Sequence, residues 1–158
     1  MSTPRLGPTI AAAVTLALTA LPAAAPAQGS APQQSLYDRL GGIYPITVVV
    51  DEFIDRLLIN DLINANPAIA AARTRVPAPG LKFHVSALVC QATGGPCQYT
   101  GRAMKPAHAH LHITEREWQE MVRVFQDVLG RLKVPAAEQQ ELVAIVESTK
   151  ADIVAPGS

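Results

Sequence analysis

The histidines are the residues of this chain whose type and spacing could do chemistry. Three of the four, His108, His110 and His112, occupy alternate positions of one short segment. Imidazole is the commonest metal ligand among side chains, and a single imidazole can also be an axial ligand of haem iron. If residues 108–112 are extended, all three imidazoles share a face, and a zinc or copper site becomes feasible. If they are helical, only His108 and His112 share a face. The alternative is that these are surface histidines near a helix start, and we favour it for His110 and His112.

His84 lies apart from this segment, on an apolar stripe that recurs at helical spacing. The residues of the stripe are Leu81, His84, Val85, Leu88, Val89 and Ala92. We therefore expect His84 to point inward. A buried neutral histidine must find a hydrogen bond or bind something, so His84 is either a satisfied core residue or a ligand.

Two cysteines, Cys90 and Cys97, bracket a turn-forming segment that contains Gly94-Gly95-Pro96. With only two, a cysteine-rich scaffold and a four-thiolate zinc or iron–sulfur site are excluded. Neither stands in a Cys-x-x-Cys-His arrangement, so covalent haem attachment of the c type is unsupported. The pair could form a disulfide if the turn brings the Cα atoms within about 7 Å; two free buried thiols are the alternative.

The N-terminal segment 1–27 has the three parts of a secretory signal peptide. Arg5 gives a positive start, residues 10–21 are an apolar run interrupted only by threonines, and Ala25-Pro26-Ala27 offers small residues for cleavage. A membrane anchor is the alternative, but the run is well short of the roughly 20 residues that span a bilayer. We expect cleavage, and no stable insertion into a membrane.

The rest of the chain divides simply. Residues 28–34 are rich in Gly, Pro, Gln and Ser and predict a flexible tether, 35–154 form one domain, and 155–158 are a tail. An exported domain would work in an oxidising compartment, periplasmic or secreted.

Composition supports a packed domain and excludes some partners. The chain is 49% hydrophobic and 16% charged, which rules out a wholly disordered protein. Its formal net charge of +0 argues against nucleic-acid binding, which needs a basic surface. Aromatic residues make up only 4%, so the core is aliphatic or something else helps to fill it.

Periodicity predicts an all-α fold with four main helices and no internal repeat. The first covers about 44–59, and the second follows Gly80 and stops at Gly94-Gly95-Pro96. The third opens on a capping box, Thr114-Glu115-Arg116-Glu117, and Val134-Pro135 ends it. The last is expected to run on through Ile153. A turn or two of helix is expected in the alanine-rich 68–75, and 96–107 read as irregular.

Taken together and in order, these segments resemble the truncated haemoglobins of the first group over about 35–154. The matching stretches are LYDRLGG at 36–42, VVDEF at 49–53, ATGGP at 92–96, YTGRAMK at 99–105, His108, IT at 113–114, VP at 134–135 and KADIV at 150–154. The resemblance implies a two-over-two helical sandwich around haem b, with a long loop before the proximal histidine.

The resemblance assigns roles to particular residues. His108 follows Met104 at the distance where the family places its proximal iron ligand. The residues implied to line the haem are Phe53, Ile54, Leu81, Val85, Met104, Trp118, Met121, Phe125, Leu142 and Val146. Tyr99, Arg102 and Lys105 are implied to approach the propionates, with ordinary surface positions as the alternative.

The chain departs from the family on the distal side. Ile54 stands where the family usually has a tyrosine, and Val85 stands at the usual glutamine position, so both hydrogen-bond donors for bound dioxygen are missing. His84 matches the position from which some members supply a second histidine to the iron. A bis-histidine haem follows as a hypothesis; the competing interpretation turns His84 aside and leaves the iron five-coordinate.

The function implied is reversible binding of a diatomic ligand, oxygen or nitric oxide, at haem iron. Dioxygenation of nitric oxide is the enzymatic variant, and it would need a separate electron-donor protein. The alternative from another class is a non-haem periplasmic protein that binds copper or zinc through His108, His110 and His112.

Overall fold

The computed structural model describes residues 34–157, so the predicted signal peptide and most of the tether lie outside the described residues. The helices are α1 (Leu36–Arg39), α2 (Ile43–Leu58), α3 (Asp61–Asn64), α4 (Pro67–Arg73), α5 (Ala78–Ala92), α6 (Met104–His108), the 3₁₀ turn η1 (Ala109–Leu111), α7 (Glu115–Arg131), α8 (Ala136–Glu147) and α9 (Lys150–Ile153). In this range the only β pairing is an isolated bridge between Ile113 and Val154. No helix of the described residues is long and apolar enough to cross a membrane.

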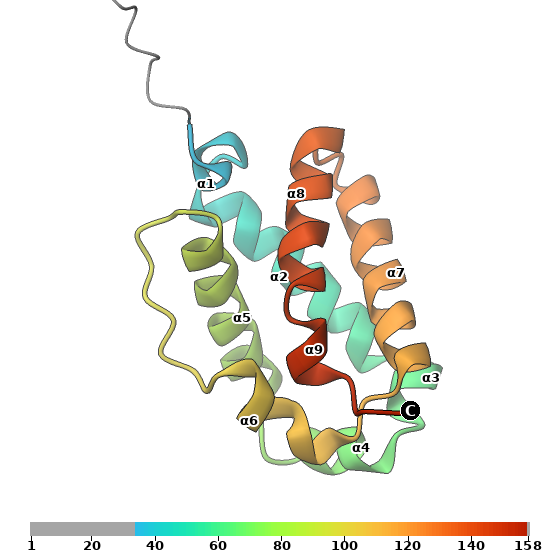
Figure 1. Cartoon of the computed structure of the whole chain (residues 1–158). Helices are drawn as coiled ribbons and strands as arrows, with labels where there is room; N and C mark the ends of the chain where they lie inside the picture. Colours follow the sequence, from blue (N-terminus) through green and yellow to red (C-terminus); the bar gives the residue numbers. More distant parts are fainter. Residues whose placement is uncertain (1–33, 158) are drawn as a thin grey trace, which may run out of the picture. The chain divides into compact units, whose positions relative to one another are not determined.

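Four long helices form two layers. α2 packs against both α5 and α7, and α7 packs against α8. Figure 1 shows α7 and α8 side by side, with α2 passing behind them and α5 on the other side of the molecule. The all-α prediction is confirmed, and the arrangement is the two-over-two helical sandwich.

Local sequence explains where these helices begin. Gly41 and Gly42 have φ of 88° and 86°, a left-handed backbone that lets the chain turn sharply between α1 and α2. At the start of α7 the predicted capping box is formed: the Thr114 hydroxyl accepts from the Glu117 amide, and the Glu117 carboxylate accepts from the Thr114 amide. The short helix predicted in the alanine-rich segment is also present, as α4.

Two apolar clusters hold the layers together. The first joins α1, α7 and α8 through Leu36, Phe125, Leu129 and Leu142. The second is the α2 row Ile46, Val50 and Ile54, against which side chains of α5 pack. Phe53 packs against both clusters, and its ring meets Phe125 edge-on at 5.2 Å between centroids. The layers are therefore joined through this aromatic pair.

Helix boundaries differ from expectation in three places. α5 begins at Ala78 rather than after Gly80, because Pro79 fits the first turn of a helix. The last helix is interrupted: the hydroxyls of Ser148 and Thr149 donate to the carbonyls of Ile145 and Val146, which competes with helical bonding. The segment read as irregular through residue 107 turns helical at Met104, where α6 begins.

Candidate functional site

His108 is the last residue of α6, and its imidazole is held by its own helix. The Nδ1 atom lies 2.8 Å from the carbonyl oxygen of Met104. A carbonyl can only accept, so Nδ1 must donate, and in the neutral ring the lone pair is then on Nε2. The geometry thus prepares one nitrogen of a half-buried His108 to bind a metal.

The chain on the C-terminal side of His108 is also fixed. Asn66, which caps α4, donates its side-chain amide to the carbonyl of Leu111 at 3.0 Å. The carbonyl of Ile113 accepts from the backbone amide of Ala155 at 2.8 Å. These contacts hold η1 and the segment behind it, so the end of α6 is anchored from both sides.

Two carboxylates near the start of α7, those of Glu117 and Glu120, also form hydrogen bonds that stabilise this region. Burial alone would raise the pKa of Glu117, but the hydrogen bonds from the backbone and hydroxyl of Thr114 outweigh it and lower that pKa. One turn further, the hydrogen bond from Arg123, with a second from Asn60, lowers the pKa of Glu120 to about 2. Both carboxylates are therefore ionised at neutral pH, and Glu120 links α7 to the start of α3.

His84 points into the protein from α5, as the apolar stripe predicts. Its Nδ1 is buried and has no hydrogen-bond partner among the described residues. Aromatic rings flank it instead: the ring centroid of Phe83 lies at 5.5 Å and that of Tyr99 at 6.3 Å, both edge-on. Within residues 34–157, the buried Nδ1 of His84 therefore lacks the hydrogen bond that the interpretation as a core residue requires.

The three neighbouring histidines do not form a site together. Residues 109–111 are a 3₁₀ turn rather than an extended segment, and successive side chains of such a turn point in different directions. His112 leaves the turn with a left-handed φ of 50°, and both His110 and His112 are exposed. Across the described residues no group of three or more His, Cys, Asp or Glu is placed to hold a metal ion. The alternative copper or zinc cluster is therefore a wrong prediction.

The expected distal positions are apolar in space as well as in sequence. Ile54 is 3% exposed in the α2 cluster, and Leu81 and Val85 of α5 pack against that cluster. None of these side chains can donate a hydrogen bond. The sequence-predicted residues Phe53, Ile54, Leu81 and Val85 are thus brought together where α2 meets α5.

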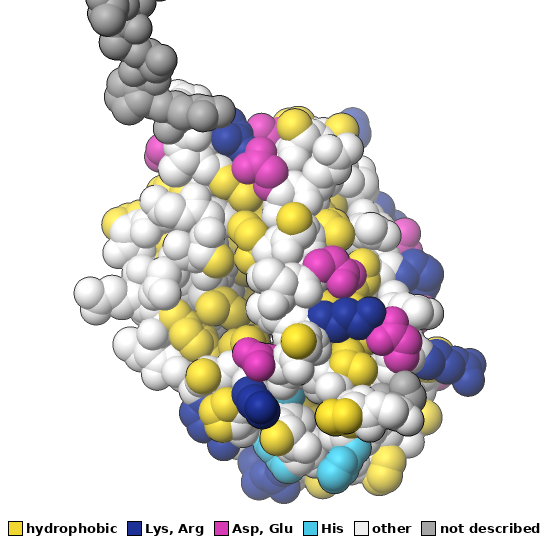
Figure 2. Space-filling model, in the orientation of Figure 1, with side chains coloured by type: hydrophobic (Ala, Val, Ile, Leu, Met, Phe, Trp, Pro, Cys, Tyr) yellow, Lys and Arg dark blue, Asp and Glu magenta, His cyan; other side chains and the backbone are white. Residues whose placement is uncertain are grey.

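The remaining predicted lining residues come from α6, α7 and α8. Phe125 is buried, and Val146 packs against its cluster. Trp118 is 2% exposed, and its indole Nε1 has no hydrogen-bond partner among the described residues. Met104 and Met121 are half-buried. Figure 2 shows hydrophobic side chains gathered in the recess between α5 and the α8–α9 column, with histidine side chains lower on the same face.

The loop between α5 and α6 carries Tyr99 and Arg102, and Lys105 lies in α6. Arg102 and Lys105 are exposed, whereas Tyr99 is half-buried beside His84. Cys90 and Cys97 form a disulfide, with their Cα atoms 5.8 Å apart, so the alternative of two free thiols does not hold. The helical spacing of apolar residues could not predict the contact between Tyr99 and His84, because Tyr99 lies in an irregular loop and His84 in α5.

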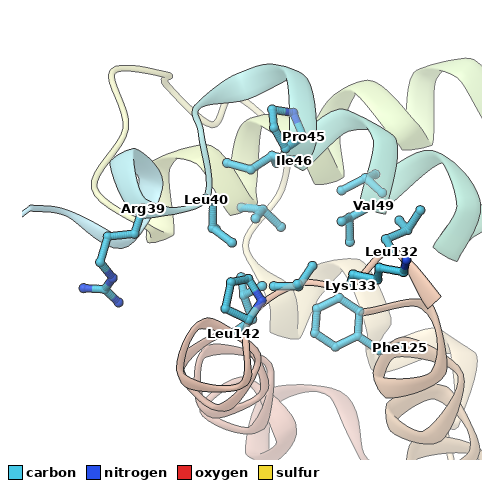
Figure 3. A pocket seen from close by; sticks show the side chains of 13 residues that line it. Arg39, Leu40, Pro45, Ile46, Val49, Phe125, Leu132, Lys133 and Leu142 are labelled. Atoms are coloured by element: carbon cyan, nitrogen blue, oxygen red, sulfur yellow. The ribbon is translucent and has the colours of Figure 1, made fainter. Parts of the chain in front are cut away.

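A separate apolar cavity of about 190 Å³ lies at the other end of the helices (Figure 3). Its wall includes Leu40, Val49, Phe125 and Leu142, with Arg39 at its edge. Neither His84 nor His108 lines it. The cavity therefore lies among α1, α2, α5, α7 and α8 and does not include the two histidines. Phe125 and Leu142, two of the residues implied to line the haem, are part of its wall.

Comparison with known proteins agrees with this arrangement. The family model described as bacterial-like globin matches residues 35–155. A group 1 truncated hemoglobin of Chlamydomonas moewusii is 28% identical over 122 residues, which is 76% of this chain and 68% of that protein. Another, from Synechocystis, is 35% identical over 103 residues, covering 63% of this chain and 76% of its own length.

Solved structures show the same fold. The Fe(III) form of the truncated hemoglobin from Tetrahymena pyriformis superposes with a TM-score of 0.67 at 20% identity, covering 77% of this chain and 98% of that one. The 2/2 hemoglobin from Synechococcus, solved in the cyanomet state with covalently attached heme, gives 0.67 at 24% identity, with 77% and 98% covered. This chain therefore belongs to the bacterial-like globin family, among the group 1 truncated hemoglobins.

Proposed function

We propose that this protein is a haem b globin that binds a diatomic ligand, oxygen or nitric oxide, with His108 as the proximal residue and His84 as a second, displaceable ligand at rest. Membership of the globin family supports the cofactor. The single observation that carries the proposal is the hydrogen bond from His108 Nδ1 to the Met104 carbonyl, because it leaves Nε2 free to bind iron.

The residues present fit a haem. A planar apolar cofactor needs an apolar lining, and the side chains of Ile54, Val85 and Phe125 supply one. It also needs few but well-placed polar groups. His84 has a buried nitrogen without a hydrogen-bond partner in the described part of the chain, which is costly unless the ring has another interaction. Haem iron, when bound, would supply the coordination position for the diatomic ligand.

The residues on the distal side favour controlled entry of the diatomic ligand over its strong retention. Ile54 and Val85 cannot donate to a bound ligand, so no distal hydrogen bond from them would slow its release. His84 would instead compete with the incoming ligand and would have to turn aside to admit it. Such a resting state suits electron transfer or gated ligand binding better than oxygen storage. Dioxygenation of nitric oxide would in addition require an electron-donor protein.

Export is part of the proposal. The sequence of residues 1–27 has the features of a cleaved signal peptide, and a disulfide between Cys90 and Cys97 suits an oxidising compartment. Expression of the full chain in a Gram-negative host tests this. We expect periplasmic protein whose mass corresponds to a start at Gln28; full-length protein retained in the cytoplasm would contradict export.

The central experiment is the absorption spectrum of the mature protein reconstituted with haemin, in wild type, His84→Ala and His110→Ala. We expect a Soret band and low-spin ferric spectra in wild type and in the exposed control His110→Ala. The His84→Ala variant should turn high-spin while keeping its haem. High-spin spectra in all three would remove His84 from the iron but keep the globin function. No Soret band in any of them would overturn the haem proposal.

A further inference from the structure

A disulfide and a tight turn fix the start of the loop that follows α5. Cys90, in the last turn of α5, is fully buried and is bonded to Cys97 in the loop. Between them, a Cβ on Gly95 would lie 2.4 Å from the ring of Tyr37 and 2.7 Å from the sulfur of Cys90. Only glycine fits this approach. The turn and the disulfide therefore fix where the chain leaves α5.

Two residues beyond the disulfide, Tyr99 is held at both ends. Its backbone amide donates to the side-chain oxygen of Gln91 at 2.7 Å, and its hydroxyl donates to the carbonyl of Arg102 at 2.7 Å. A Cβ on Gly101 would lie 2.4 Å from the tyrosine ring, so the ring rests directly on the loop backbone. Tyr99 thus has one defined position, which depends on the course of the loop.

The held ring faces His84. The two ring centroids are 6.3 Å apart and the planes are nearly perpendicular, at 85°. The other aromatic neighbour, Phe83, is 67% exposed, so few contacts hold its ring in place. Because Nδ1 of His84 has no hydrogen-bond partner in residues 34–157, no hydrogen bond at that atom sets the rotation of the imidazole. Of the two aromatic rings that contact His84, only that of Tyr99 is held in place by a hydrogen bond of its own side chain.

We propose that Tyr99, fixed by the Cys90–Cys97 disulfide, is a positioning residue that holds the His84 imidazole in the orientation from which it binds haem iron. The inference rests on the proposed function, in which His84 is the second ligand. Edge-on aromatic contacts are weak individually, so the loss of this one should change the occupancy of the His84 bond roughly two- to tenfold.

The test compares wild type with Tyr99→Leu, Tyr99→Phe and Cys97→Ser, all reconstituted with haemin. Tyr99→Leu removes the ring but keeps apolar bulk, whereas Tyr99→Phe keeps the ring and loses only the hydroxyl bond to Arg102. Cys97→Ser frees the loop while Cys90 still fills its buried place. The readouts are the low-spin fraction of the ferric protein and the limiting rate of carbon monoxide binding to the ferrous protein, which reports dissociation of His84.

We expect Tyr99→Leu to lower the low-spin fraction and to raise the limiting rate roughly two- to tenfold. Cys97→Ser should change both in the same direction. Tyr99→Phe keeps the ring contact and loses one of its two anchors, so it should change both less than Tyr99→Leu does. A retained Soret band and an unchanged helical circular dichroism spectrum establish that each variant is folded. A variant that fails this check is replaced by Gln91→Ala, which removes the acceptor of the Tyr99 amide.

The outcomes separate the two proposals. A low-spin wild type whose spectrum and limiting rate do not change in Tyr99→Leu and Cys97→Ser would overturn the role of Tyr99 and leave His84 as a ligand. Equal effects of Tyr99→Phe and Tyr99→Leu would also overturn it, because the hydroxyl rather than the ring contact would then matter. A high-spin wild type that still binds haem would overturn both the second ligand and its positioning.

Discussion

The Nδ1 atom of His108 lies 2.8 Å from the carbonyl oxygen of Met104, one turn earlier in α6. This relationship orients the imidazole as the proposed role of iron ligand requires, because the backbone fixes both the tautomer and the ring plane. It requires the helical geometry that α6 provides between Met104 and His108.

The first prediction concerns this ligand. His108→Gly should leave a space of imidazole size and abolish tight haem binding, and free imidazole added to the variant should restore a Soret band. The exposed His110→Gly is the matched control and should bind haem as wild type does. Titration with haemin, followed by absorption with and without imidazole, measures both. An unchanged spectrum of His108→Gly without imidazole would show that another residue holds the iron.

The second prediction concerns the missing distal donor. In the His84→Ala background, Val85→Gln should place an amide where the half-buried valine now lies. It should slow oxygen dissociation about fivefold, since one hydrogen bond contributes about 1 kcal/mol. Val85→Leu, which adds bulk but no donor, is the control. Stopped-flow displacement of oxygen by carbon monoxide measures the rate. Equal rates for the glutamine and leucine variants would mean that residue 85 does not face the ligand.

Much of the fold was predictable because it depends on local patterns. The capping box at Thr114 is a short-range signal with one structural meaning, and α7 begins there as expected. Helical spacing likewise predicts the helix over about 44–59, and α2 covers Ile43–Leu58. The break between α8 and α9 was missed because the apolar pattern continues to Ile153 while the competition comes from hydroxyl groups at residues 148 and 149.

The site was less predictable, because it depends on contacts between segments far apart in the sequence. The stripe on α5 included Ala92, which is exposed, whereas Cys90, at 0% exposure, is the best buried residue of that helix. Cys90 is buried beside its disulfide partner and the turn at Gly95, and the helical spacing of apolar residues predicts neither feature. The contact of Tyr99 with His84 has the same origin, and no sequence signal within α5 could have found it.

A third prediction concerns the capping box that Thr114 and Glu117 form at the start of α7. Thr114→Ala removes the oxygen that accepts from the Glu117 amide and should lower the free energy of unfolding by about 1 kcal/mol. Thr114→Ser retains the oxygen and should cost only a few tenths of that energy. Urea denaturation followed by circular dichroism measures both. Equal stability of the alanine and serine variants would contradict a role for the cap.

The last prediction is a pH dependence carried by Glu120. In the folded protein its pKa is lowered to about 2, first by the hydrogen bond from Arg123 and then by that from Asn60. A lowered folded-state pKa gives stability that is present above the ordinary carboxyl pKa of about 4.5 and is lost as the pH falls toward about 2. Because Arg123 is more than half exposed, solvent screening limits the contribution to about 1 kcal/mol.

The free energy of unfolding should therefore fall more steeply in wild type than in Glu120→Gln as the pH is lowered through this window. Arg123→Met should flatten the curve in the same way, because it removes the main cause of the lowered pKa while leaving the carboxyl in place. Urea denaturation at a series of pH values measures the three curves, and the difference from wild type isolates the contribution of the Glu120 carboxyl. Parallel curves for wild type and Glu120→Gln would show that the link from α7 to α3 carries no pH-dependent stability.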